Sequence, residues 1–128
     1  MVTKISNTRG GGVARSTGPA LEAAYRFLLW LIPTVEKFPR SQKFLLGDRI
    51  QTVALDVLER LIEATYTKAR GDSLAAANLG IEKLRFMFRL ASELRHLDLR
   101  RYEHAARSLD EIGRLIGGWR KAHDAHQA

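Results

Sequence analysis

Residues 79–97 read LGIEKLRFMFRLASELRHL, and two apolar stripes run along this stretch when it is drawn as a helix. At 100° per residue, the stripes fall on nearly opposite sides. A surface helix of a monomeric bundle needs one apolar stripe, facing the core. A helix buried on both sides would also explain two stripes, but a bundle of four helices has no central helix, so we expect the second stripe to contact another subunit. The first stripe holds Ile81, Leu84, Phe88 and Ala91, and the second holds Leu79, Phe86, Leu90, Leu94 and Leu97.

Helical periodicity also runs through the chain before this stretch. The first helix is predicted to begin at Pro19, to kink at Pro33 and to end by Pro39. The second is predicted to begin at the N-cap Ser41 and to end near Ala69. Their buried sides are predicted to hold Leu21, Ala24, Leu28, Leu31 and Val35 in the first helix, and Leu46, Ile50, Val53, Val57, Leu61 and Ala64 in the second.

The stretch RGDS at residues 70–73 is predicted to be a turn, because glycine, aspartate and serine favour turns and helix caps. Asp72 or Ser73 is expected to cap the third helix, which is predicted to end near His96. A fourth helix is expected to follow Asp98.

Short loops between long amphipathic helices favour antiparallel neighbours. The predicted fold class is therefore all-α, an antiparallel up-down four-helix bundle over residues 19–122. Residues 1–18 hold three basic residues and no acidic one, and we expect them to form a flexible basic tail; residues 123–128 are expected to form a C-terminal tail. The fourth helix should end near Lys121 and bury Tyr102, Ala106, Leu109, Ile112 and Ile116.

Three glycines, Gly47, Gly80 and Gly113, lie inside predicted helices at intervals of 33 residues. A glycine inside a helix costs ~1 kcal/mol relative to alanine. The positions around the three glycines do not match, so the spacing does not indicate a repeat. We instead expect each glycine to allow a close approach between helices.

The chain is strongly basic, with a net charge of +7 and 15 arginines against 6 lysines. Arginine is preferred where planar contacts to phosphate or carboxylate are made, so this balance favours an anionic partner such as nucleic acid over a merely basic surface. The chain has no cysteine, and no apolar run of ~18 residues that could span a membrane. We expect a cytoplasmic protein. Trp30 and Trp119 fall near helical packing positions and are expected to pack rather than stack on bases.

Glu93 and His96 have the spacing found in di-iron carboxylate bundles, but such sites need two of these pairs and two further glutamates. The remaining histidines, His104, His123 and His126, form neither a zinc motif nor a nucleophile triad. We therefore predict no metal, no cofactor and no catalytic residue, and hence a protein that is not an enzyme.

Basic residues form rows on the last two predicted helices. Arg85 and Arg89 lie one turn apart without a carboxylate one turn before them, so we expect them to bind an anion. In the fourth helix, basic residues recur every seven positions and drift by only ~20° per step. Glu103 and Asp110 each lie four residues before an arginine of this row, which favours ion pairs that stabilise the helix. The row consists of Arg100, Arg107, Arg114 and Lys121.

Three motifs resemble one known family. They are F-P-R-S-x-[KR]-F from residue 38, L-R-F-x-x-R-L from residue 84, and D-E-I-G-R-L-I-G-G-W from residue 110. These stretches resemble the accessory variability determinant proteins of bacterial diversity-generating retroelements, which are related to the four-helix-bundle proteins of ribosomal-RNA intervening sequences. The similarity covers about residues 21–121 and leaves out the basic tail.

The resemblance implies a pentameric barrel that binds the retroelement's reverse transcriptase and nucleic acid, either template RNA or cDNA. Such a protein supports mutagenic retrohoming and has no catalysis of its own. Arg85 and Arg89 match arginines implicated in binding the reverse transcriptase, and Arg40 and Lys43 of the first motif join the candidates. The alternative is a structural bundle whose oligomer binds an unrelated RNA or protein. Which of RNA, DNA or reverse transcriptase is the primary ligand stays open, as does the gene that is diversified.

Overall fold

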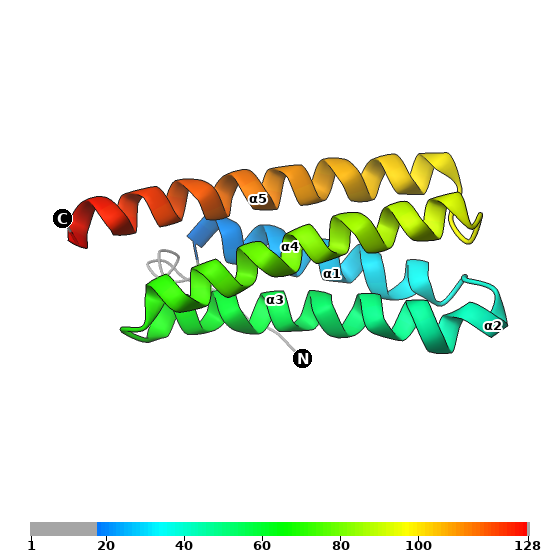
Figure 1. Cartoon of the computed structure of the whole chain (residues 1–128), viewed down its shortest axis with the longest axis horizontal. Helices are drawn as coiled ribbons and strands as arrows, with labels where there is room; N and C mark the ends of the chain where they lie inside the picture. Colours follow the sequence, from blue (N-terminus) through cyan, green and yellow to red (C-terminus); the bar gives the residue numbers. More distant parts are fainter. Residues whose placement is uncertain (1–17, 128) are drawn as a thin grey trace, which may run out of the picture.

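The computed structural model describes residues 18–127, and within this part of the chain the regular secondary structure is helical, with no strand. Four long helices lie side by side, and a short helix followed by a π-helical segment joins the first to the second (Figure 1). In chain order the elements are α1 (Gly18–Val35), α2 (Arg40–Gln42), η2 (Lys43–Gly47), α3 (Asp48–Tyr66), α4 (Arg70–Glu93) and α5 (Leu99–Gln127).

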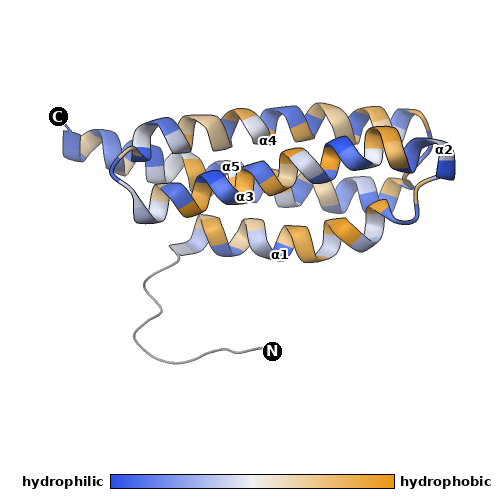
Figure 2. Cartoon of the chain, turned by 90° about the horizontal axis from the view of Figure 1, so that it is seen from below, coloured by the Kyte–Doolittle hydropathy of each residue, from blue (hydrophilic) through white to orange (hydrophobic). Residues whose placement is uncertain are grey.

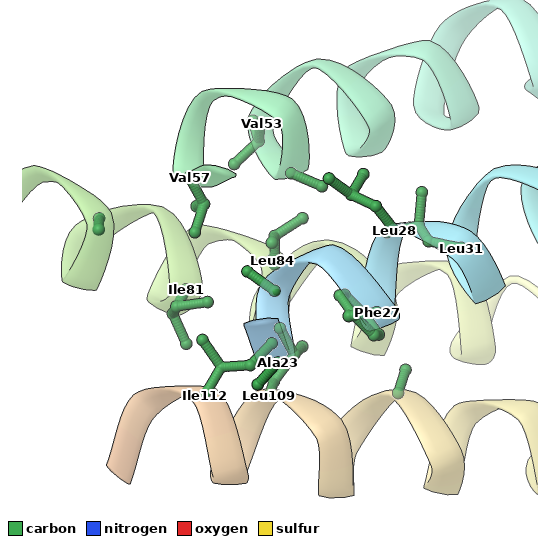
Figure 3. Close-up of a cluster of buried hydrophobic side chains, with 14 of the residues drawn as sticks. Ala23, Phe27, Leu28, Leu31, Val53, Val57, Ile81, Leu84, Leu109 and Ile112 are labelled. Atoms are coloured by element: carbon green, nitrogen blue, oxygen red, sulfur yellow. The ribbon is translucent and has the colours of Figure 1, made fainter. Parts of the chain in front are cut away.

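Each long helix packs against two neighbours. Helix α3 contacts α1 and α4, and α5 contacts α4 and α1, which confirms the predicted all-α four-helix bundle. All four helices contribute to one hydrophobic core. In Figure 3, core side chains from the four helices point toward one another; they include Phe27 and Leu31 of α1, Val53 and Val57 of α3, Ile81 and Leu84 of α4, and Leu109 and Ile112 of α5.

The predicted buried sides of the helices are largely confirmed. In α1, and in α3 from Ile50 onward, every residue predicted to be buried is buried. In α5, Leu109, Ile112 and Ile116 are buried as predicted, but Ala105 is buried in place of Tyr102 and Ala106, which are only partly covered. Leu97 was placed on the second stripe of the third helix, but it lies beyond the end of α4 and is buried in the core, because the chain has turned there.

Several predicted helix ends are wrong. Ser41 is not an N-cap: Pro39 holds that position without a side-chain hydrogen bond, and Ser41 lies inside α2. The RGDS stretch is the first turn of α4, whose N-cap is Ala69, so neither Asp72 nor Ser73 caps it. Local cap preferences of about 1 kcal/mol were overridden by packing of the long helices.

The end of the first helix agrees with the sequence prediction, and the end of the last helix does not. Helix α1 continues through Pro33 and ends at Val35, before Pro39. Helix α5 continues to Gln127, so the chain after Lys121 is helical where a tail was expected. The predicted basic tail, apart from Gly18, lies outside the described residues.

The expected close approach is confirmed for two of the three helical glycines. A Cβ atom on Gly47 would lie 2.7 Å from Cγ1 of Val35, and one on Gly80 would overlap Cγ2 of Val57. Gly113 differs, because its nearest neighbour would be the guanidinium of Arg85, whose Nη2 would lie 3.0 Å away and can move.

The turn between α4 and α5 is held by hydrogen bonds at both helix ends. The N–H of His96 donates to the carbonyl of Ala91 and the N–H of Arg95 donates to that of Ser92, both at 2.9 Å. This is a Schellman motif, with Arg95 (φ 63°) in the left-handed conformation that glycine usually takes. Asp98 then caps α5, since its Oδ1 accepts the N–H of Arg101 at 2.8 Å.

Candidate partner-binding surface

A groove of about 350 Å³ runs between α4 and α5, and both predicted anion-binding arginines line it. Arg85 and Arg89 reach it from α4, and Tyr102 lines it from α5. These two arginines therefore lie beside α5 and not on a separate surface of α4. The other lining residues are Glu82, Phe86, Phe88, Ala106 and Leu109.

Arg85 is tied to carboxylates, contrary to the expectation that it lacks acidic partners. Its Nη1 pairs with Asp110 of α5, and its Nε lies 3.3 Å from Oε2 of Glu82. The hydrogen bond with Asp110 raises the pKa of Arg85 further above its ordinary value. A spacing of four residues within one helix does not reveal Glu82, three residues before Arg85, or Asp110 on the neighbouring helix. Arg85 thus connects α4 to α5.

Arg89 also has a partner, one turn after it instead of before. Its Nε lies 3.1 Å from Oε2 of Glu93, and both side chains are more than half exposed. An exposed pair of this kind contributes only about 0.3–0.5 kcal/mol. An anionic partner can therefore displace Glu93 from Arg89 at little cost.

The basic row of α5, Arg100, Arg107, Arg114 and Lys121, lies on the exposed side of that helix. The expected pairs of Arg107 with Glu103 and of Arg114 with Asp110 do not form. Asp110 pairs with Arg85 instead. Among residues 18–127, none of the four cations in the row lies within 4.0 Å of a carboxylate oxygen. Of the two predicted rows, the one on α5 is therefore available to a partner, whereas Arg85 and Arg89 of α4 are already paired.

The two candidates from the first motif lie at the junction between α1 and α3. Arg40 is exposed in α2. Lys43 in η2 pairs with Glu36 at 3.1 Å and lies 5.7 Å from the centre of the Phe44 ring. Arg40 thus has no carboxylate partner among the described residues, whereas Lys43 is held by its neighbours.

Glu93 and His96, the pair with di-iron spacing, each contact other residues. Glu93 binds Arg89, and the His96 ring packs 6.1 Å from the ring of Phe38. Within the described part of the chain, no three histidine, aspartate or glutamate side chains gather as a metal site would require. The His104 ring packs against Trp30 at a tilt of 43°, with 4.5 Å between ring centres, so both serve packing.

A second kind of candidate surface is apolar. The second stripe of α4 is exposed as predicted: Leu79, Phe86, Leu90 and Leu94 are each at least 49% exposed. Figure 2 shows apolar residues along α1 and α3 as well. Large apolar side chains exposed on one side of several helices mark an interaction surface. On α1 these are Tyr25, Leu29 and Ile32, and on α3 they are Leu55, Ile62 and Tyr66.

Membership of a known family follows from sequence comparison. A model of the bAvd-like family, the bacterial accessory variability determinants, matches residues 21–123. The chain belongs to this family. No curated protein matches the chain, and no solved structure does.

The bAvd-like family is an accessory, non-catalytic family of diversity-generating retroelements, and this chain has such an accessory role. The match spans α1 to α5 and includes the α4–α5 groove and the basic row. It confirms the resemblance drawn from the three motifs. None of the helices between residues 18 and 127 combines the length and apolar character needed to cross a bilayer.

Proposed function

We propose that this bAvd-like protein binds the reverse transcriptase of its retroelement together with template RNA or cDNA, and so supports mutagenic retrohoming. The observation that carries this proposal is the basic row of α5, four exposed cations without carboxylate partners among the described residues. The α4–α5 groove beside it adds Arg89, whose pairing with Glu93 is weak.

The proposed binding is electrostatic. Nucleic acid releases condensed counterions when lysine or arginine neutralises its phosphates, and this release drives association. A cation without a protein partner gives this gain in full, whereas Arg85 would first have to leave Asp110. The basic row is therefore the main contact, and Arg85 mainly holds the groove in shape.

We further propose that copies of the chain assemble through the exposed apolar side chains of α4 and of α1 and α3. The apolar stripe of α4 lies on a different helix from those of α1 and α3, and contact between unlike surfaces of identical copies produces a ring when the rotation between copies closes. Five copies, the number that the family resemblance implies, would present five basic rows to one polyanion. Linked weak sites of this kind bind far more tightly than one site alone.

Two double variants separate recognition from structure. Arg107→Ala with Arg114→Ala should weaken binding to single-stranded RNA by at least about tenfold, and should reduce the salt slope by about 0.7 for each lost phosphate contact. The melting temperature should not change, because both arginines are exposed and unpaired. Arg85→Ala with Arg89→Ala should lower the melting temperature and have the smaller effect on RNA affinity.

The same variants are then tested for capture of the reverse transcriptase. Unchanged affinity for both RNA and reverse transcriptase in the Arg107 and Arg114 double variant would contradict the proposal. Binding of an unrelated RNA or protein in preference to the retroelement components would favour the structural oligomer instead.

A further inference from the structure

A pocket of about 530 Å³ lies at the end of the bundle where α3 leads into α4 and where α5 ends. Figure 1 shows the start of α1 at this same end. Three segments contribute to the pocket: the α3–α4 turn, the first residue of α4 and the last turns of α5. Cationic groups, imidazoles and one aromatic ring line it, with no carboxylate: Lys68, Arg70, Trp119, His123 and His126.

Arg70 is fixed in this pocket by contacts on two sides. Its Nε donates to the carbonyl of Ala64 at 2.6 Å, and its guanidinium lies 6.0 Å from the centre of the Trp119 ring. The hydrogen bond uses only one of the five N–H groups of an arginine, so the terminal nitrogens stay available. An arginine held in place beside an aromatic ring is well suited to a planar or tetrahedral anion.

The two histidines face the pocket from α5. Nε2 of His123 would lie 3.4 Å from a Cβ atom on Gly71, so this imidazole sits close above the first turn of α4. Nδ1 of His126 lies 3.2 Å from the carbonyl of Ala122, which leaves its Nε2 turned away from the helix backbone. Lys68 is exposed in the turn beside them.

We propose that this pocket binds a phosphate group of a nucleic-acid strand, as a site separate from the basic row of α5. Arg70 and Lys68 supply the charge, His123 and the protonated form of His126 supply further N–H donors, and Trp119 offers a surface for the adjoining sugar or base. The sequence adds a reason to expect a strand and not a single phosphate. Residues 1–17, which precede α1 in the sequence, carry three basic residues and no acidic one.

The experiment reads the pocket through its tryptophan. The full chain is labelled with 5-fluorotryptophan, which gives two fluorine resonances, one from Trp119 in the pocket and one from Trp30 in the core. A Trp119→Phe variant assigns them. Inorganic phosphate, a mononucleotide and a short single-stranded oligonucleotide are titrated separately. The Trp119 resonance should shift to saturation with the oligonucleotide, and the Trp30 resonance should stay in place.

Neutral variants test which groups are responsible. Lys68→Gln combined with His123→Gln and His126→Gln should raise the oligonucleotide concentration at the titration midpoint by about tenfold. This is the effect of losing one or more charge-assisted contacts. Lys68→Gln alone, at an exposed position, should show part of this loss without any risk to folding. The matched control is Lys37→Gln with Lys83→Gln. It removes more formal charge, yet it should leave the Trp119 midpoint unchanged.

Each outcome decides the question. An unshifted Trp119 resonance with all three probes would overturn the site. An equal midpoint in the triple variant and the wild type, or an equal loss in the control, would overturn it too. Saturation by inorganic phosphate or mononucleotide at concentrations as low as those of the oligonucleotide would support a phosphate site but overturn the strand as its ligand. Because the Arg107 and Arg114 double variant leaves these side chains intact, failure here is distinguishable from failure of the proposed main surface.

Discussion

Replacing Gly80 by alanine should destabilise the bundle, although alanine is the better helix former. The added Cβ would overlap Cγ2 of Val57, which is 3% exposed and belongs to the packed face of α3. Valine is stiff at χ1, so its methyl group cannot rotate away without strain. Overpacking of this kind costs about 1–3 kcal/mol. The gain in helix propensity offsets ~1 kcal/mol of that cost.

Gly118→Ala is the matched control, because nothing lies within 4 Å of a Cβ atom at that helical position. There the propensity gain acts alone, so this variant should be more stable than wild type by ~1 kcal/mol. The two substitutions should therefore differ by about 1–3 kcal/mol, the overpacking cost alone. Urea unfolding followed by circular dichroism measures this difference, at one fixed protein concentration because assembly shifts apparent stability.

A double-mutant cycle identifies the contact. Val57→Ala removes the methyl groups that Gly80→Ala would strike, so the double variant should be more stable than the sum of the single effects predicts, with a coupling of ~1 kcal/mol. Equal stabilisation by Gly80→Ala and by Gly118→Ala would refute the close-approach argument. Strict additivity in the cycle would show that Val57 is not the limiting neighbour.

Further substitutions test the α4–α5 turn and the apolar stripe. Arg95→Gly should stabilise the chain by about 1 kcal/mol in urea unfolding, since a side chain at φ 63° carries a cost that glycine avoids. The N–H of Arg101 lowers the pKa of the Asp98 carboxyl below its ordinary 3.8, so stability from this cap is present above that value and is lost as pH falls through the lower folded pKa. Asp98→Asn should therefore flatten the fall of melting temperature in acid. Phe86→Ser should reduce the assembled mass seen by light scattering toward 14.4 kDa, whereas Leu99→Ser, at an exposed leucine outside the apolar stripes, should not; an unchanged mass would exclude the α4 stripe as an interface.

The fold could be predicted from periodicity because each long helix buries one continuous side. Residues such as Leu31, Val57 and Ile112 were placed in the core by spacing alone, and they lie there. The helix ends were less predictable. Ser41 has a strong local preference for a cap, but the chain enters α2 at Pro39, which a local preference cannot reveal.

The candidate site was harder to predict, because charge pairing depends on neighbouring helices. Sequence spacing predicts an ion pair between Asp110 and Arg114. In the structure α4 packs on α5, and Asp110 pairs with Arg85 instead. The pocket at the end of the bundle could not be predicted from a sequence motif, because Lys68, Arg70 and His123 belong to three separate segments. Residues 123–128 were expected to form a tail, which would not place His123 and His126 at this pocket. They lie there because α5 continues to Gln127.

The π-helical segment η2 (Lys43–Gly47) has a consequence for how the length of this chain can vary. A π-helical turn is what an α-helix becomes when it takes up one extra residue. Deleting one residue between Lys43 and Gly47 would restore an ordinary helix and leave Ile50 and the buried side of α3 in phase. The same deletion elsewhere in α3 would rotate every later side chain by ~100° away from its place in the core. This junction is therefore where the loss of one residue can be accommodated during divergence without rebuilding the bundle.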